Sequence, residues 1–449
     1  MFDFVIVGAG VGGLFIANEL VELNKKIIVF ESQNEVGGRC ITTSHRREKG
    51  AWRVHVSHER VMKLMKKLNI IYNPTRSSKI EKEQKQDLHV AKRAKKGMTL
   101  FETMMLKHGI TKAQLIDQNT GYMGITKTSR RSYSTDNNEF VVPTKGMQEI
   151  PIQLAKQLNK KIVLNARVAY IKYDNLKKRY DVYIMIRNIN KSNDFTRKKY
   201  HAKNIILNCQ PVHFPDTNFN RKLSLIKSCV GTEPLTHVYV TLDKPLPPTY
   251  KVTNDLLGQV VSVTPKQIMI SYSGGDLATF HYHFHMNHEK EYIAMLQKLF
   301  PCKFTEVQVF YHEHGVGLWK PNPSGQTVEL MEKCAVIHPV LLPGLYCVNE
   351  NISARYHGWM EGALEVAELV LKYIAKQKKH KILTTMPKEY LIYDKRVLDV
   401  HEWKKIHPGS EQAIKNHLGE DVTWLFDNIH STKSEPLQYI LGLQTGFVN

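Results

Sequence analysis

The stretch VIVGAGVGGL at residues 5–14 decides the fold. Residues 2–8, FDFVIVG, form an apolar run typical of a buried strand, and residues 9–23 carry apolar side chains at helical spacing. The next run, KKIIVFE at 25–31, predicts a second strand. A strand, a helix and another strand in this order make a βαβ unit, so we expect an α/β Rossmann-like domain at the start of the chain.

The glycines of this stretch follow the pattern G-x-G-x-x-G between the strand and the helix. Gly8 permits a tight turn, Gly10 removes the side chain that would block a pyrophosphate, and Gly13 lets the helix pack on the strand. Gly12 is grouped with them as a cofactor contact, and the helix N-terminus directs its partial positive charge at the phosphates. Glu31 closes the second strand, where an acid can hydrogen-bond a ribose hydroxyl. These features together predict dinucleotide binding.

The 449-residue chain has room for two or three domains, and its 42% hydrophobic and 23% charged residues are ordinary for a globular protein. No apolar run is long enough to cross a bilayer, and the N-terminal residues lack the pattern of a signal peptide. The six cysteines show no CxxC spacing. We therefore expect reduced thiols, an intracellular, cytosol-like location and no transmembrane anchor.

The formal charge of +21 has two interpretations. It reflects either a Lys-rich codon bias or attraction to an acidic electron-transfer partner. Nucleic acid is not expected, because no basic helix or stacking-aromatic motif accompanies the charge. The Lys-, Ile- and Asn-rich composition is typical of an AT-rich genome such as that of a large virus, in which case the virion is an alternative location.

The middle of the chain gives weaker signals. Residues 74–98 are charged and almost without large apolar side chains, which predicts a surface insertion of unknown role. Residues 166–174 and 177–188 predict a β-hairpin, residues 203–209 predict a buried strand, and the region 236–285 is β-rich in composition.

Three segments of the first half carry a family resemblance: ESQNEVGGRCITT at 31–43, EKGAWRVH at 48–55 and PTKGMQEIPIQLA at 143–155. They resemble the flavin-dependent amine oxidases, a group related to polyamine oxidases and, more distantly, to phytoene desaturases and protoporphyrinogen oxidases. The resemblance implies FAD rather than NAD. A bare backbone and a guanidinium suit a diphosphate. The resemblance implies FAD contacts at Gly37, Gly38, Arg39, Ala51, Trp52 and, beside the adenine, Val168.

The segment 338–370, HPVLLPGLYCVNENISARYHGWMEGALEVAELV, is similar to the C-terminal FAD motif of the same family. The resemblance implies that Glu350 lies near the ribitol and pyrophosphate and that the helix start at Trp359 and Met360 faces the flavin ring. Considered alone, Trp359 and Met360 are better explained as core residues at helical spacing, but the two terminal motifs together favour flavin binding. The cysteine that tethers FAD in some members is not recognisable, so we expect FAD to be bound non-covalently.

The chain departs from the family where many amine oxidases carry a lysine that holds a water near the flavin. The matching position in the segment 234–248 is His237, which either positions a water or is a half-buried strand residue. Of the paired aromatic side chains that flank the amine, Trp359 fits one wall and Trp319 is the candidate for the other. The run HEHG at 312–315 lacks a third ligand, so we expect no metal there.

Residues 390–448 resemble cytochrome b5 over their whole length. The resemblance implies that His407 and His430 are the axial ligands of a b-type haem, each at a helix end. Ser410 stands where the family has a second glycine. The alternative is a haem-free relative of the same fold that serves as a binding module.

The charge is divided unevenly along the chain. Residues 390–449 contain six Lys/Arg and eight Asp/Glu, a net charge of −2. The remainder therefore carries 63 − 6 = 57 positive and 42 − 8 = 34 negative residues, a net charge of +23. An acidic haem module tethered to a basic flavin domain is expected to associate with it electrostatically.

The sequence thus predicts an α/β Rossmann-like FAD-binding domain with an inserted mixed α+β substrate domain, followed by a small α+β cytochrome b5-like domain.

The leading hypothesis is an FAD-dependent, amine oxidase-like oxidoreductase that passes electrons to the tethered haem, with oxygen as another acceptor. The rivals are a desaturase or isomerase of an apolar substrate and a catalytically silent flavoprotein scaffold. We expect a flavin amine oxidase-like domain at 1–377 (FAD-binding parts at about 1–60, 140–235 and 335–377; substrate part at about 61–139 and 236–334), a linker at 378–388 and a haem domain at 389–449.

Overall fold

A computed structural model divides the chain into two compact units, Met1–Val370 and Leu371–Asn449. In the described part of the chain, no helix is both long and apolar enough to cross a membrane. The charged insertion expected at 74–98 lies almost wholly outside that part. The structure describes residues 1–75, 100–111, 140–174, 176–188, 194–218, 223, 227, 230–247, 250–252, 257, 259–300, 302–319, 340–342, 344–353, 356, 358–377, 387–394, 396–407, 409–430 and 443–447.

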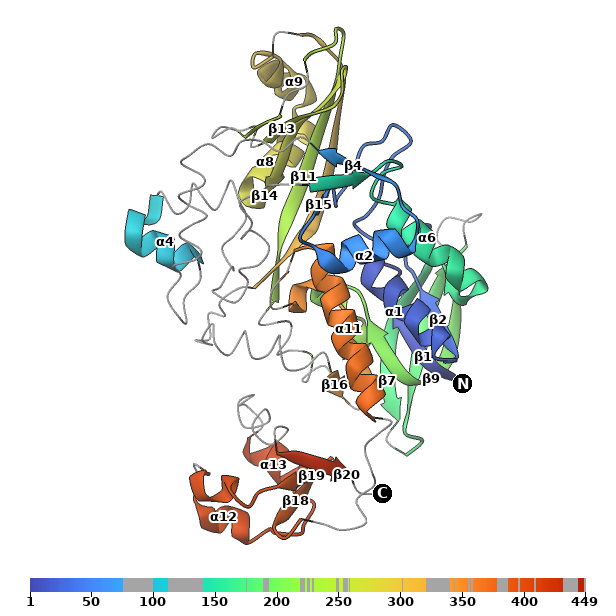
Figure 1. Ribbon diagram of the computed structural model, residues 1–449, viewed down its shortest axis with the longest axis vertical. Helices are drawn as coiled ribbons and strands as arrows, with labels where there is room; N and C mark the ends of the chain where they lie inside the picture. The colour runs from blue at the N-terminus through green and yellow to red at the C-terminus, as the bar shows by residue number, and fades with distance from the viewer. Residues whose placement is uncertain are drawn as a thin grey trace. The chain divides into compact units, whose positions relative to one another are not determined.

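The predicted βαβ unit forms the centre of a nine-stranded sheet in the first unit (Figure 1). β1 (Phe2–Val7) pairs in parallel with β2 (Ile27–Phe30) on one side and with β9 (Phe195–Leu207) on the other. α1 (Val11–Glu22) connects β1 to β2. β2 is buried along its whole length because helices and strands cover both faces of a parallel sheet. The other strands are β6 (Ile162–Val163), β7 (Ala166–Asp174), β8 (Arg179–Arg187), β10 (Asp216–Thr217), β16 (Val340–Leu342) and β17 (Leu345–Cys347).

A second, antiparallel sheet of five strands lies mostly within the residues that the sequence analysis assigns to the substrate part, and we refer to it as the substrate sheet. Its longest strands, β11 and β15, pair along most of their length, and α8 packs against β11. The β-rich prediction for 236–285 is wrong at its end, where Gly275, with φ of +60°, starts α8. Ala278 and His281, one helical turn apart, are buried there. The elements are β11 (Val230–Leu242), β12 (Tyr250–Val252), β13 (Gln259–Thr264), β14 (Gln267–Gly274), α8 (Gly275–Asn287), α9 (Glu289–Gln297) and β15 (Phe304–Trp319).

Smaller elements complete the first unit, and α11 runs beside the main sheet as a long amphipathic helix (Figure 1). These elements are β3 (Val54–His55), α2 (Glu59–Lys67), β4 (Tyr72–Thr75), α4 (Leu100–His108), β5 (Phe140–Pro143), α6 (Glu149–Leu158), α11 (Met360–Gln377) and the short 3-10 helices η2 (Asn159–Lys161), η3 (Pro211–His213) and η4 (Glu350–Ile352). Three of the strands, β3, β5 and β4, form a separate sheet.

The second unit has its own small sheet and core. β18 (Tyr390–Tyr393) and β19 (Arg396–Asp399) form a hairpin, whose turn holds Asp394 at φ of +47°. A compact apolar cluster including Leu391, Leu398 and Val400 packs beneath two short helices. The remaining elements are η5 (Trp403–Ile406), α12 (Glu411–Lys415), α13 (Thr423–Ile429) and β20 (Gln444–Phe447).

A buried arginine fastens the loop after β2 to the substrate sheet. The Arg47 side chain is 2% exposed, and its guanidinium donates to both carboxylate oxygens of Glu306 at 2.8 and 2.5 Å. It also donates to Gln308 at 2.6 Å and to Thr241 at 2.9 Å. Hydrogen bonding from Arg47 lowers the pKa of Glu306 to about 2. The ion pair therefore holds the two parts of the first unit together.

We predict that Arg47→Met lowers the free energy of unfolding of the first unit by about 2 kcal/mol at neutral pH, because the hydrogen bonds of the buried guanidinium to Glu306, Gln308 and Thr241 are lost. Glu306 has a folded-state pKa below its ordinary 4.5, so its ion pair stabilises the protein above pH 4.5 and is lost as the pH falls towards about 2. Urea unfolding of the variant should therefore approach that of the wild type at low pH. Lys63→Met is the control, since Lys63 is 80% exposed and lies 3.9 Å from Glu59. An effect of Arg47→Met no larger than that of the control would contradict the prediction.

Candidate functional site

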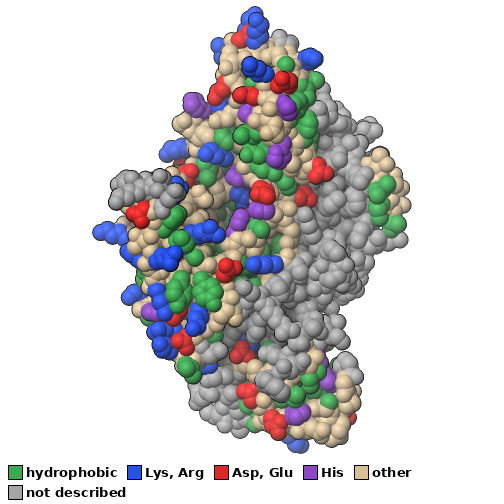
Figure 2. All heavy atoms as spheres, turned by 180° about the vertical axis from the view of Figure 1, so that it is seen from behind, with side chains coloured by type: hydrophobic (Ala, Val, Ile, Leu, Met, Phe, Trp, Pro, Cys, Tyr) green, Lys and Arg blue, Asp and Glu red, His purple; other side chains and the backbone are tan. Residues whose placement is uncertain are grey.

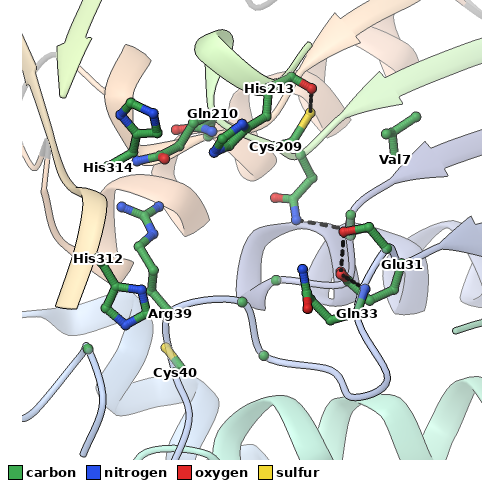
Figure 3. Close-up of a pocket in the computed structure, with 18 of the residues that line it drawn as sticks. Val7, Glu31, Gln33, Arg39, Cys40, Cys209, Gln210, His213, His312 and His314 are labelled. Carbon is green, nitrogen blue, oxygen red and sulfur yellow. Dashed lines mark hydrogen bonds between the residues drawn. The ribbon is translucent and has the colours of Figure 1, made fainter. Parts of the chain in front are cut away.

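A cavity of about 1410 Å³ runs through the first unit, from the turn after β1 to the start of α11. Its walls come from the β1–α1 turn, the loop after β2, strand β7, the segment after β9 and strand β15 (Figure 3). These walls lie at the carboxyl ends of β1 and its parallel neighbours, where open α/β sheets bind ligands.

The glycine turn is packed so closely that side chains are excluded. A Cβ atom on Gly13 would come within 2.4 Å of the Gly8 carbonyl oxygen, and Gly8 has φ of +102°. Asn208, at the end of β9, donates from its side chain to that same carbonyl at 3.1 Å. Gly10 and Gly12 line the cavity, whereas Gly13 serves the packing of α1 on β1. The turn therefore presents bare backbone and a helix N-terminus to the cavity.

Glu31 is held rigidly on the opposite side of this turn. Its carboxylate accepts from the backbone N–H of Ala9 at 2.7 Å and of Gln33 at 2.9 Å, and the side chain lines the cavity (Figure 3). Val168, on β7, lines the same end of the cavity. This end has the donors, acceptors and bare backbone that an adenosine diphosphate requires.

Arg39 joins three segments of the cavity wall. Its Nη1 lies 2.6 Å from Oε1 of Glu350 and donates to the carbonyl oxygen of Gly315 at 3.0 Å. Gly37 and Gly38, which precede it, both have positive φ and line the cavity. The loop after β2, strand β15 and the segment before α11 therefore meet at one guanidinium.

The far end of the cavity is aromatic. Trp359 and Met360 line it at the start of α11, together with Ala51, Tyr272 and Tyr311. The Trp359 ring lies edge-on to His58, with centroids 4.8 Å apart, and parallel to Phe140 at 6.4 Å. Tyr311 stacks on Tyr282 of α8 at 4.2 Å.

One residue predicted at this end, Trp52, lies behind the wall. Trp52 is 7% exposed and packs with Tyr239, Val261 and Met269, so it contributes to the substrate core. The side chain of Trp319, the second predicted aromatic wall, lies outside the described residues.

His237 is fully buried on β11 and is absent from the described cavity lining. Its Nδ1 is 2.7 Å from the Glu48 carbonyl oxygen, and its ring meets that of Tyr272 edge-on at 4.7 Å. Burial lowers the pKa of His237 to about 3, so the ring is neutral at physiological pH. Its buried Nε2 has no hydrogen-bond partner among the described residues. His237 therefore does not line the described cavity, but its ring packs against Tyr272, which does.

In the second unit, the structure brings His407 and His430 together. Their ring centroids are 6.4 Å apart, and the rings are close to perpendicular. With metal–nitrogen bonds of about 2 Å, two imidazoles on opposite sides of one iron have ring centres about 6 Å apart. His407 Nδ1 is 3.2 Å from the Ser410 carbonyl oxygen, which is the kind of contact that orients a ligating imidazole through its other nitrogen.

The turn that follows His407 favours glycine at two positions, 409 and 410. A Cβ atom on Gly409 would meet the His407 ring at 2.8 Å. Ser410 has φ of +87°, a backbone conformation that favours glycine, and its side chain accepts from the Ala413 N–H to cap α12. The family's second glycine is therefore replaced by a strained serine that gains a helix cap.

Three families match successive parts of the chain. An NAD(P)-binding Rossmann-like domain matches residues 6–68, a flavin containing amine oxidoreductase matches 72–371, and a cytochrome b5-like heme/steroid binding domain matches 375–443. The second match spans most of the chain. The chain belongs to the flavin containing amine oxidoreductases. This oxidoreductase therefore uses FAD and carries a C-terminal cytochrome b5-like domain for haem, as the sequence analysis predicts.

Solved amine oxidases share the fold of this oxidoreductase. Putrescine oxidase bound to putrescine is 14% identical, with a TM-score of 0.64, over 84% of this chain and 99% of that one. Cyclohexylamine oxidase from Brevibacterium oxydans IH-35A is 12% identical, with the same TM-score and the same coverage. A Delta 8-(E)-sphingolipid desaturase from Emericella nidulans is 39% identical over 59 residues, which is 13% of this chain and only 10% of that protein.

We predict that Ser410→Gly raises the stability of the second unit by about 0.5–1 kcal/mol, because relief of the positive φ outweighs the few tenths lost at the cap. Ser410→Ala is the matched control: it keeps the strained φ, loses the cap and should be destabilising. Thermal unfolding followed by haem absorbance gives both values. A lower transition temperature for the glycine variant than for the wild type would contradict the prediction.

Proposed function

We propose that this oxidoreductase oxidises an amine at the aromatic end of the cavity and passes the electrons singly to its own haem. The observation that carries the proposal is one cavity that joins a dinucleotide cradle to an aromatic pocket, in a chain whose second unit pairs His407 with His430. When bound, FAD accepts a hydride from the carbon next to the amine nitrogen, and haem accepts one electron at a time.

The residues of the first unit have the following proposed roles. Gly10, Gly12 and the α1 N-terminus bind the diphosphate, and Arg39, held by Glu350, adds a guanidinium to it. The other proposed FAD contacts are Gly8, Gly13, Glu31, Gly38, Ala51, Val168 and Met360, with Trp52 packed behind them. We propose that FAD is bound non-covalently.

The proposed role of the aromatic end of the cavity is to orient the amine and to exclude water. Trp359, clamped by His58 and Phe140, and Tyr311, stacked on Tyr282, offer flat apolar surfaces that a neutral amine can enter. The neutral His237 positions Tyr272 from behind rather than exchanging protons itself. Trp319 stays a candidate for the second wall.

The second unit has the features of an electron carrier. If both His407 and His430 bind the iron, both axial positions are filled and no site for oxygen chemistry is left. The electrons of the flavin then leave through the haem to an external acceptor, and direct reaction of the flavin with oxygen is a side path. We propose the domain limits 1–377 for the flavin domain and 389–449 for the haem domain, with a linker between them.

A second candidate is a desaturase or isomerase of an apolar substrate. The replacement of the family's lysine by His237 favours it, because His237 is fully buried and is absent from the described cavity lining, so it does not take the place of a lysine that faces the substrate. Reduction of the bound flavin by polyamines or aromatic amines distinguishes the two candidates. If no amine reduces the flavin and the enzyme instead desaturates or isomerises an apolar substrate, the second candidate is correct.

His407→Ala tests the relay. The variant should lose the haem spectrum, keep bound flavin and keep the rate at which an amine reduces the flavin, while electrons no longer reach a haem-dependent acceptor. His417→Gln is the control, because His417 is partly exposed and its Nδ1 lies 2.8 Å from a carboxylate oxygen of Glu420. Stopped-flow absorbance measures both steps. If His407→Ala kept its haem, the ligand assignment would be wrong; if it reduced the acceptor at the wild-type rate, the relay would be wrong.

A further inference from the structure

One wall of the cavity carries more hydrogen-bond donors than the described protein groups satisfy. Gln210 follows β9, is 7% exposed and lines the cavity, and its buried Nε2 has no partner among the described residues. An unsatisfied buried amide is costly unless a ligand completes it. Figure 3 shows Gln210 beside His213, with the Arg39 guanidinium extending towards both.

Two histidines from separate elements meet on the same wall. The rings of His213, at the end of η3, and His314, on β15, have centroids 5.1 Å apart and cross at 72°. His314 Nδ1 is 2.8 Å from Thr232 Oγ1, which fixes the ring. Histidine side chains gather along the hollow of the face seen in Figure 2.

A bulge in the substrate sheet directs His314 to this wall. Glu233 on β11 pairs with Val316 on β15, but Leu235 pairs with His312, so residues 313–315 bulge opposite Pro234 alone. Bulges of this kind redirect side chains and are common beside binding sites. The bulge also places the Gly315 carbonyl where Arg39 donates to it.

The charges around the pair are mostly positive. Burial lowers the pKa of His213, and so do His314, Arg39 and Arg167, while Glu313 acts in the opposite sense. Glu350 is already paired with Arg39 at 2.6 Å. Cations and donors on this wall therefore outnumber the opposing Glu313 carboxylate, which favours an anion site.

We propose that Gln210, His213 and His314 form a second phosphate-binding wall, which contacts the FAD diphosphate across the cavity from the glycine turn. The same cavity holds the bare backbone at Gly10 and the Arg39 guanidinium, so the dinucleotide diphosphate is the anion that this wall can reach. The inference rests on the proposed FAD site and is independent of amine turnover.

Binding of the diphosphate brings negative charge beside His213, whose pKa burial and the neighbouring cations lower in the free protein. The pKa of His213 then rises, so binding takes up protons and FAD affinity falls as the pH rises through the bound-state value. One titrating histidine can contribute up to about a tenfold change in Kd per pH unit. The affinity should therefore be highest in mildly acidic solution.

The test uses the full-length chain freed of flavin, with FAD Kd measured from fluorescence quenching at about pH 6 and about pH 8.5. For the wild type we expect Kd to rise at least about tenfold between the two values. The double variant His213→Gln/His314→Gln should bind FAD about tenfold more weakly at the lower pH and equal the wild type at the higher pH. ADP, measured by displacement of FAD, should show the same pattern because it shares the diphosphate.

Two further variants separate charge from hydrogen bonding. Gln210→Leu should weaken FAD by about fivefold at both pH values, since the amide does not titrate. His283→Gln, an exposed histidine on α8, should behave as the wild type. The inference is overturned if the double variant keeps the wild-type pH slope, or if it is weakened equally at both values, as a structural defect would be. An inactive enzyme with the expected pH linkage would refute the amine oxidase proposal and leave this one standing.

Discussion

The ion pair between Arg39 and Glu350 is the interaction on which the cavity of the first unit depends. The Glu350 side chain is 8% exposed, and an unpaired carboxylate there would be strongly destabilising. The pair connects the glycine-rich loop after β2 to η4, and the same guanidinium donates to Gly315 on β15. Segments from the beginning, middle and end of the first unit are thus fixed around one space. Trp359 lies just beyond this connection, so the position of the aromatic end is set by it.

The parts of the site that follow local rules could be predicted from the sequence. The G-x-G-x-x-G turn requires glycine at Gly8 because of its positive φ and at Gly13 because a Cβ atom would meet the Gly8 carbonyl oxygen, and Glu31 lies at a fixed spacing from the turn. Gln210, His213 and His314 could not be predicted, because a β-bulge and a parallel strand bring them together from distant positions. Asn208 gives a weak signal, since it ends a predicted buried strand at the edge where α/β folds bind ligands. Trp52 resembles a family contact in sequence, but tertiary packing places it in the substrate core.

The second unit shows how a departure from a family pattern is explained by backbone geometry. Ser410 occupies a position whose φ of +87° suits glycine, and the hydroxyl partly compensates by capping α12. A Cβ atom on the neighbouring Gly409 would come within 2.8 Å of the His407 ring, so a substitution there would shift that ring. The position of the His407 ring is therefore sensitive to the residue at 409, whereas position 410 accommodates serine.

The central claim is that amine oxidation in the first unit supplies electrons to the haem in the second. The most direct test is an anaerobic titration of the full-length protein, carrying both cofactors, with a polyamine while flavin and haem absorbance are recorded together. Because flavin holds two electrons and haem one, the account predicts complete reduction of both by about 1.5 equivalents of an amine that gives up two electrons. Reduction of both cofactors by dithionite, with neither changed by any amine, would contradict the account.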